Sequence, residues 1–204
     1  LEHLTKWLVV ILGVLIILYS LGVPIGPVLT GFGIGGLAVA LALQDTLSNF
    51  FSGLHLLISK QIRPGDYVRL DSGEEGYVVD ITWRNTVIRE LPNNYIIVPN
   101  AKLSKATIKN YYFPDKEVAV VVQVGVSYDS DLEKVEKITT EVAREVLKDV
   151  AGGVPTFDPF IRYHTFSEYA INFSVILKAQ EFVDQHLIKH EFIKRLHERY
   201  KREG

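Results

Sequence analysis

The chain has 204 residues, of which 48% are hydrophobic and 23% are charged, and its formal net charge is -2. This near-neutral balance gives no basic footprint for nucleic acid. The absence of cysteine excludes a disulfide framework, a thiolate nucleophile and a cysteine-ligated zinc site. The apolar residues are concentrated near the N-terminus, because residues 7–43 contain no Asp, Glu, Lys, Arg or His. That distribution excludes a plain soluble enzyme and indicates a membrane protein with a soluble C-terminal part.

The apolar stretch is long enough for two spans, since one helix crosses about 30 Å of hydrocarbon with roughly 20 residues. The sequence Pro24-Ile25-Gly26-Pro27 predicts a tight turn, so we expect spans over residues 4–21 and 28–43. A signal peptide is the alternative for the first span, but it lacks an A-x-A-like cleavage site and a second apolar span follows at once. Because the chain begins with Leu1 and contains no Met, we expect its natural N-terminus to lie upstream.

A hairpin of two spans returns the chain to the side from which it started, which places Lys6, Lys60, Arg63 and Arg69 on one face of the bilayer. The positive-inside rule makes that face the cytoplasm. We therefore expect a multi-pass protein of the cytoplasmic membrane, with its large C-terminal domain in the cytoplasm.

The second span carries a stripe between two surfaces of small residues, when residues are placed at about 100° intervals around a helix. The stripe contains Thr30, Ile34, Leu37, Leu41, Asp45 and Ser48. One flank contains Gly33, Gly36 and Ala40, and the other contains Gly31, Gly35, Ala38 and Ala42. Small residues mark surfaces where helices approach closely in membranes.

Two such surfaces suit a helix that contacts a neighbour on each side in a closed ring, with the stripe facing the axis. The stripe would then line a pore, and Leu37 and Leu41 would form two apolar rings that close it by dewetting. From the pattern alone, a packing helix inside the bundle of one subunit is an equal alternative.

The character of the sequence changes at Asp45. This residue is suited to cap a new amphipathic helix over residues 46–59, so we expect a kink near Asp45 and a surface-lying segment after it. A carboxylate at the edge of a membrane is also a functional candidate, and a ring of Asp45 side chains at the inner mouth of a pore would favour cations.

The rest of the chain predicts two soluble units. Short alternating runs predict strands over residues 67–70, 77–81, 86–90 and 95–98, which is typical of a small β-barrel or sandwich. The next segments predict a strand at 117–127, a helix at 131–148, strands at 160–166 and 170–178, and a helix at 182–202. This order is that of an α+β unit of ferredoxin-like type, and Ser130 or Asp131 can cap its first helix.

Catalytic patterns are weak. His186 and His190 have the i, i+4 spacing of metal ligands, but the Glu of an H-E-x-x-H motif is missing between them, so an exposed helix face is the better interpretation. Ser127, Asp129 and His164 supply the residue types of a triad without a nucleophile-elbow sequence. We therefore predict no enzyme, no catalytic residue, no metal site and no cofactor.

Several ordered motifs carry a resemblance to a known family. They are GGLAVALALQ (residues 35–44), LSNFFSG (47–53), IRPGDYV (62–68), WRNT (83–86) and IIVPN (96–100). With these motifs the chain closely resembles the small-conductance mechanosensitive channel (MscS) family over essentially its whole length.

The resemblance implies a homoheptamer that is opened by membrane tension during osmotic downshock and passes ions and small osmolytes with little selectivity. Membrane lipids are then partners of the channel. The family's two leucine rings match Leu37 and Leu41, and its packing residues match Gly33, Gly36, Ala38 and Ala40.

The resemblance also implies transmembrane α-helices (residues 1–60), with a kinked pore-lining helix, a small Sm-like β-barrel (61–110) and an α+β ferredoxin-like vestibule domain (111–204). The chain departs from the family at three places. Asp45 replaces the usual kink glycine, Ala40 stands where glycine is common, and no small closing strand is evident after Arg202. A ligand-modulated channel of the same family and a non-conducting, membrane-anchored scaffold are the alternative functions.

Overall fold

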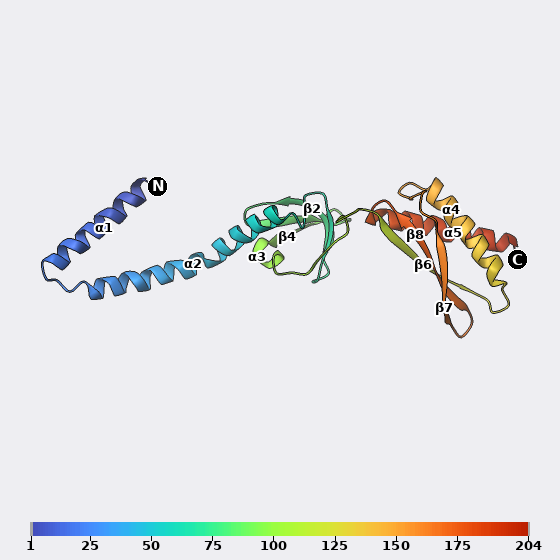
Figure 1. Ribbon diagram of the computed structural model, residues 1–204, viewed down its shortest axis with the longest axis horizontal. Coiled ribbons are helices and arrows are strands. Elements are labelled where there is room, and N and C mark those ends of the chain that lie inside the picture. Colours follow the sequence, from blue (N-terminus) through green and yellow to red (C-terminus); the bar gives the residue numbers. More distant parts are fainter. Residues whose placement is uncertain (1, 204) are drawn as a thin grey trace.

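The apolar N-terminal stretch forms two helices, α1 (Glu2–Ser20) and α2 (Gly26–Ser59), joined by a short turn. In the computed structural model, which describes residues 2–203, they lie at one end of an elongated molecule (Figure 1). A β-domain follows in the middle and an α+β domain forms the other end (Figure 1).

The turn between the two helices lies earlier than the sequence predicts. The chain reverses at Leu21 and Gly22, where Gly22 has a positive φ of 78° that favours glycine. Gly26 and Pro27 already belong to the first turn of α2, because a proline there has no N–H that the helix needs. Among the described residues, α2 alone is long and apolar enough to cross a membrane, and the apolar part of α1 is shorter.

The prediction that Asp45 caps a separate helix is wrong. The helix α2 runs without interruption through this position to Ser59. Residues 44–46 contain neither glycine nor proline, so the backbone hydrogen bonds of the helix continue. In addition, the side-chain Nδ2 of Asn49 donates to the carbonyl of Asp45 at 2.8 Å. Figure 1 shows that α2 changes direction partway along its length while it stays helical.

The β-domain is an antiparallel five-stranded sheet with the order β4-β3-β2-β1-β5. Its elements are β1 (Tyr67–Leu70), β2 (Glu75–Ile81), β3 (Asn85–Arg89), β4 (Tyr95–Pro99), α3 (Asn100–Leu103) and β5 (Ile108–Asn110). The four predicted strands are confirmed to within two residues at each end, but α3 and β5 were not predicted. Both are too short to show a period, and β5 is defined by its pairing with β1, in which Val68 lies opposite Asn110.

Apolar side chains on alternate strand positions form the core of the β-domain. Leu56 and Ile62, from the end of α2 and the loop after it, are buried in the same cluster as Val68, Val78 and Ile88. The last turns of α2 are therefore part of this domain, which joins the apolar helix to the sheet without a free linker.

The α+β domain is a three-stranded antiparallel sheet with the order β6-β8-β7, covered by two helices. Its elements are β6 (Val118–Val126), α4 (Leu132–Asp149), β7 (Phe160–Phe166), β8 (Ile171–Ala179), the 3-10 turn η1 (Phe182–Asp184) and α5 (Gln185–Glu203). Of the two predicted caps, Ser130 and Asp131, it is Asp131 that caps α4, by accepting hydrogen bonds from the N–H groups of Glu133 and Lys134 at 3.0 and 3.2 Å. The predicted C-terminal helix is divided, because its first turn is the separate element η1.

Candidate functional site

The first half of α2 is an apolar helix that nothing in the described chain covers. At about 1.5 Å per residue, the 34 residues of α2 extend about 51 Å, which exceeds the roughly 30 Å of a hydrocarbon core. Of the predicted stripe, Leu37 and Leu41 are each 61% exposed and Ile34 is 66% exposed. Apolar side chains with this exposure need lipid or neighbouring helices around them.

The polar members of the stripe have different environments. The hydroxyl of Thr30 donates to the carbonyl of Gly26 at 2.9 Å, so it is satisfied within the helix itself. Asp45 is exposed, and the described structure gives its carboxylate no hydrogen bond or ion pair. Ser48 is half-buried, because it lies where α2 begins to approach the β-domain.

Both flanks of small residues are open. A methyl group added to Gly31, Gly33, Gly35 or Gly36 would meet nothing within 4 Å outside the helix's own backbone. Ala38 and Ala40 are exposed on the same helix. Since flat glycine and alanine surfaces allow close packing of membrane helices, the single chain presents two unused packing faces.

The second half of α2 is joined to α3 by side-chain hydrogen bonds of Asn49 and Ser52, a set of contacts that we call the clip. The side chain of Asn49 is 8% exposed, and its Oδ1 accepts a hydrogen bond from the N–H of Ala101 at 3.0 Å. The hydroxyl of Ser104 donates to that of Ser52 at 3.1 Å. Gly53 allows the two elements to come this close, because a Cβ at that position would lie 2.5 Å from Nδ2 of Asn100.

Asn100 anchors α3 in the sheet in turn. It is fully buried, its Oδ1 accepts from the hydroxyl of Thr86 at 2.9 Å, and its Nδ2 donates to the carbonyl of Thr82 at 2.8 Å. The end of α2 is therefore joined to the sheet of the β-domain through two neighbouring residues of α3, Asn100 and Ala101.

The sequence analysis missed the residues of this clip. Asn49, Gly53 and Leu56 follow i, i+4, i+7 spacing, which places them on one face of α2. This spacing was a usable signal, since an asparagine and a glycine on one face of an otherwise apolar helix indicate a close polar contact. Its partners in α3 lie 52 residues away in the sequence and had no comparable signal.

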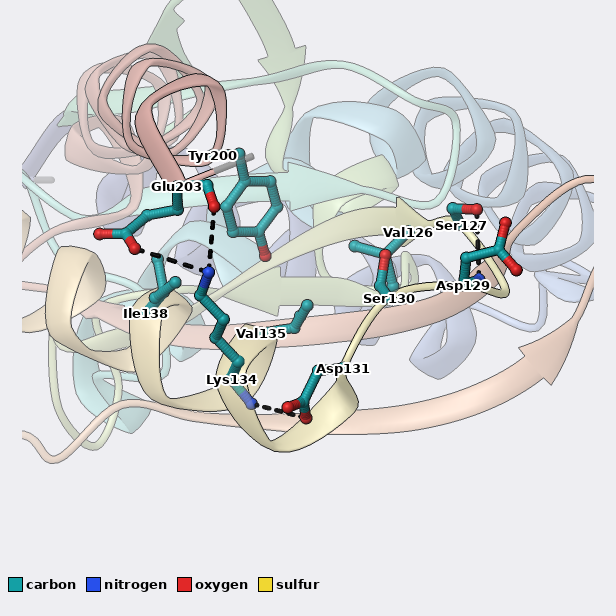
Figure 2. A pocket seen from close by; sticks show the side chains of 10 residues that line it. All are labelled: Val126, Ser127, Asp129, Ser130, Asp131, Lys134, Val135, Ile138, Tyr200 and Glu203. Atoms are coloured by element: carbon teal, nitrogen blue, oxygen red, sulfur yellow. Dashed lines mark hydrogen bonds and ion pairs between the residues drawn. The ribbon is translucent and has the colours of Figure 1, made fainter.

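A cavity of about 410 Å³ opens in the α+β domain between the loop after β6, the start of α4 and the end of α5 (Figure 2). Several of its polar groups contact one another or the backbone. Lys134 pairs with Glu203 at 3.7 Å and donates to the Glu203 carbonyl at 3.0 Å, while Asp131 caps α4. The contacts of Lys134, Glu203 and Asp131 therefore have a structural role in holding α4 and α5.

The catalytic residue types are not assembled into a site. The ring of His164 contacts Thr165 at 2.7 Å and Gln123 at 3.0 Å, on strands β7 and β6, and Ser127 and Asp129 lie in the loop beside the cavity instead. His186 and His190 are exposed on α5. Among the described residues, no three His, Cys, Asp or Glu side chains are grouped to hold a metal ion.

An apolar helix with two open packing faces, fixed to a water-exposed β-domain, is the arrangement of an integral membrane protein. Comparison with known families assigns both parts. Residues 4–44 match transmembrane helices 2/3 of the mechanosensitive ion channel family, and residues 45–112 match its β-domain.

Individual relatives agree with this assignment. The chain is 36% identical over 183 residues to the small-conductance mechanosensitive channel MscMJ of Methanocaldococcus jannaschii, covering 90% of this chain and 50% of that protein. It is 34% identical over 172 residues to the low conductance mechanosensitive channel YnaI of Escherichia coli, covering 82% of this chain and 49% of that protein. The chain thus spans about half the length of the curated relatives it matches.

The fold agrees as well. The crystal structure of Helicobacter pylori MscS in its closed state superimposes with a TM-score of 0.74 at 28% identity, over 95% of this chain and 74% of that chain. The protein belongs to the MscS family of mechanosensitive ion channels. Its relatives are ion channels of the membrane, which agrees with the resemblance that the sequence motifs indicate.

Proposed function

We propose that copies of this chain surround an ion pore, with the stripe of α2 facing the axis and its glycine flanks packed against the neighbouring copies. The observation that carries the proposal is the open space around both glycine flanks of α2, next to a stripe of exposed apolar side chains. A closed ring uses two different faces of every copy, whereas a simple dimer uses one. The family assignment supports a homoheptamer.

Leu37 and Leu41 are the constriction in this proposal. They lie four residues apart, so each contributes to one of two apolar rings about 6 Å apart along the helix. Water leaves a narrow apolar passage, and the pore is then closed to ions without being physically filled. Thr30 and Ile34 line the pore on one side of the constriction, and Asp45 and Ser48 line it on the side of the β-domain.

Membrane tension opens the pore by favouring the state with the larger area in the membrane plane. The open flanks at Gly33, Gly36, Ala38 and Ala40 are surfaces on which neighbouring helices slide or separate, because they carry no bulky side chains that interlock. The clip at Asn49 keeps the end of α2 fixed to its β-domain during this motion.

The proposed channel lies in the cytoplasmic membrane as a multi-pass protein, with its C-terminal domains in the cytoplasm. We assign residues 1–60 to the membrane part, 61–110 to an Sm-like β-domain and 111–204 to an α+β vestibule domain. The strand order β6-β8-β7 supports a ferredoxin-like relationship for the last of these. The permeants are ions and small osmolytes, and the physiological role is protection against osmotic downshock.

Purified protein in liposomes tests the proposal directly. Pressure steps applied to excised patches are expected to give stepwise currents whose open probability rises with tension. Currents that appear only after a small molecule is added would favour the ligand-modulated alternative. A protein that inserts and folds but conducts at no tension would favour the alternative function, a membrane-anchored scaffold.

A further inference from the structure

The β-domain and the α+β domain meet at an aromatic joint around Phe182, the first residue of η1. The ring of Phe182 stacks on that of Tyr67 with centroids 4.9 Å apart and an interplanar angle of 26°. The centroid of the Phe182 ring also lies 3.9 Å from that of the Tyr111 ring. Tyr67 is fully buried, while Phe182 and Tyr111 are half-buried, so the contact covers a tyrosine of the interior from its edge.

A polar contact lies beside the aromatic one. Glu181 uses both carboxylate oxygens across the joint: Tyr112 donates to Oε2 at 2.6 Å and Lys116 donates to Oε1 at 2.9 Å. The Lys116 ammonium also lies 4.6 Å from the centre of the Tyr112 ring. Hydrogen bonds to a charged carboxylate are among the stronger polar contacts, and Tyr112 is only 9% exposed.

The two contacts join segments that are distant in the sequence. Tyr112 and Glu181 are 69 residues apart, and the whole sheet of the α+β domain lies between them. The segment 111–117 is the only covalent connection between the domains. By itself it would leave the α+β domain free to rotate relative to the β-domain. Glu181 and Phe182 follow β8, whose last residue Ala179 pairs with Val118 at the start of β6. Their contacts hold this end of the α+β domain against the β-domain at a second point, which removes this freedom.

The joint is continuous with α2. Tyr67 is the first residue of β1, and its neighbour Val68 packs in the same core cluster as Leu56 of α2. Together with the clip between Asn49 and Ala101, this makes α2, the β-domain and Phe182 one packed unit.

We propose that Glu181 and Phe182 form a latch that couples the α+β domain to α2 through the β-domain, so that the position of the α+β domain biases the pore. The latch residues contact no permeant and act as positioning residues. This inference rests on the proposed function, because it assigns a mechanical role within that channel.

Hydrogen exchange of the full-length oligomer in detergent tests the latch itself. The variants are Phe182→Ala, which removes the stacking ring, and the milder Glu181→Gln and Tyr112→Phe, which retain volume. Amides of residues 111–117 and 179–185 are expected to exchange about tenfold faster in Phe182→Ala, with smaller increases in the other two. Amides of α4 are expected to keep their wild-type rates.

The matched control is Glu141→Gln, which removes an ion pair with Arg199 at 3.4 Å inside the α+β domain. It should leave the exchange of residues 111–117 unchanged. Unaltered exchange at the joint in all three latch variants would show that the domains are not held together by these residues and would overturn the proposal.

Patch recording tests the coupling. Phe182→Ala is expected to change the tension of half-opening or the closing rate while the single-channel conductance stays at the wild-type value, because the constriction is untouched. Phe182→Tyr, which keeps the ring, should restore wild-type gating. Faster exchange at the joint with unaltered gating in Phe182→Ala would refute the coupling. A wild-type protein that never conducts would instead remove the proposed function, while the exchange data would still report on the joint.

Discussion

The side chain of Asn49 on α2 accepts a hydrogen bond from the backbone N–H of Ala101 on α3, at 3.0 Å and across 52 residues of sequence. The other end of the same amide donates to the carbonyl of Asp45 one turn earlier. This side chain is the contact nearest to the membrane-spanning half among those that join α2 to the β-domain.

Replacing Asn49 by Ala should weaken this connection. The N–H of the half-buried Ala101 would lose its acceptor, a loss that typically reduces stability by about 0.5–1.5 kcal/mol. Thermal unfolding of the detergent-solubilised protein is expected at a lower temperature than for the wild type. Asn94→Ala, in an exposed turn, is the control. Equal unfolding temperatures for the two variants would show that the hydrogen bond of Asn49 does not contribute to stability.

The substitutions Leu37→Ser and Leu41→Ser should make the proposed pore leaky. A hydroxyl in the narrow apolar rings makes it easier for water to refill them, so the closed state loses its barrier. In liposome patches we expect a larger current without applied pressure and opening at lower tension. Val39→Ser, on the same helix but away from the stripe, should have a smaller effect. If both leucine variants kept the wild-type threshold and closed-state current, the constriction would not be here.

Asp45→Asn should reduce the preference of the channel for cations. The carboxylate is exposed and has no partner among the described residues, so it adds negative charge to the proposed inner mouth. Reversal potentials in asymmetric KCl measure this preference. Asp129→Asn, in the α+β domain, is the comparison. An unchanged reversal potential in Asp45→Asn would place this residue outside the conduction path.

Valine substitutions at two glycines of α2 should separate folding from assembly. At Gly36 nothing lies within 4 Å in the single chain, so a valine is compatible with the fold of one copy but blocks close approach of a neighbour. At Gly53 a Cβ would lie 2.5 Å from Nδ2 of Asn100, so a valine disrupts the contact with the β-domain.

Native mass spectrometry and thermal unfolding distinguish the two defects. Gly36→Val is expected to lose the oligomer while the β-domain unfolds at nearly the wild-type temperature. Gly53→Val is expected to unfold earlier. An intact oligomer in Gly36→Val would contradict ring packing through this flank.

The contribution of the Glu181 contact to stability should depend on pH. Hydrogen bonds from Tyr112 and then Lys116 lower the pKa of Glu181 below its ordinary value of 4.5. A carboxyl whose pKa is lowered by folding stabilises the protein above its unfolded pKa, and this stabilisation is lost as the pH falls through the folded pKa. The contact with Glu181 also raises the pKa of Lys116 above 10.5, so its contribution is lost only in strong alkali.

The difference in unfolding temperature between wild type and Glu181→Gln is therefore expected to be constant near neutrality and to shrink below about pH 4.5. Thermal scans between neutral and acidic pH measure it. A difference that persisted undiminished in acid would mean that the charge of Glu181 does not contribute to the joint.

Local patterns made much of the fold predictable. The apolar run of α2 and the alternation of the β-domain strands have the periods of their secondary structures, so their existence could be predicted from the sequence. The cap at Asp131 was predicted for the same reason, since its hydrogen bonds reach only two and three residues along the chain. Asp45 has the same capping chemistry, but α2 continues through this position with its backbone hydrogen bonds uninterrupted, so no new helix begins there.

The candidate site was predictable only in part. The stripe of Leu37 and Leu41 and its small-residue flanks follow from helical spacing, and their exposure agrees with that placement, while their role in a pore stays a prediction. The motifs around them also sufficed to indicate the family, which the comparisons confirm.

The amino-acid sequence by itself determined that uncharged helical segments, one with small residues on two faces, precede a β unit and an α+β unit, because these properties depend on neighbours within one or two turns. Only the tertiary structure decided how the parts are joined: Asn49 to Ala101, and Phe182 to Tyr67. Such contacts are made between residues far apart in the chain. They form only when whole sheets and helices have packed, since the entropy lost in bringing distant residues together is offset by the burial of the surrounding core.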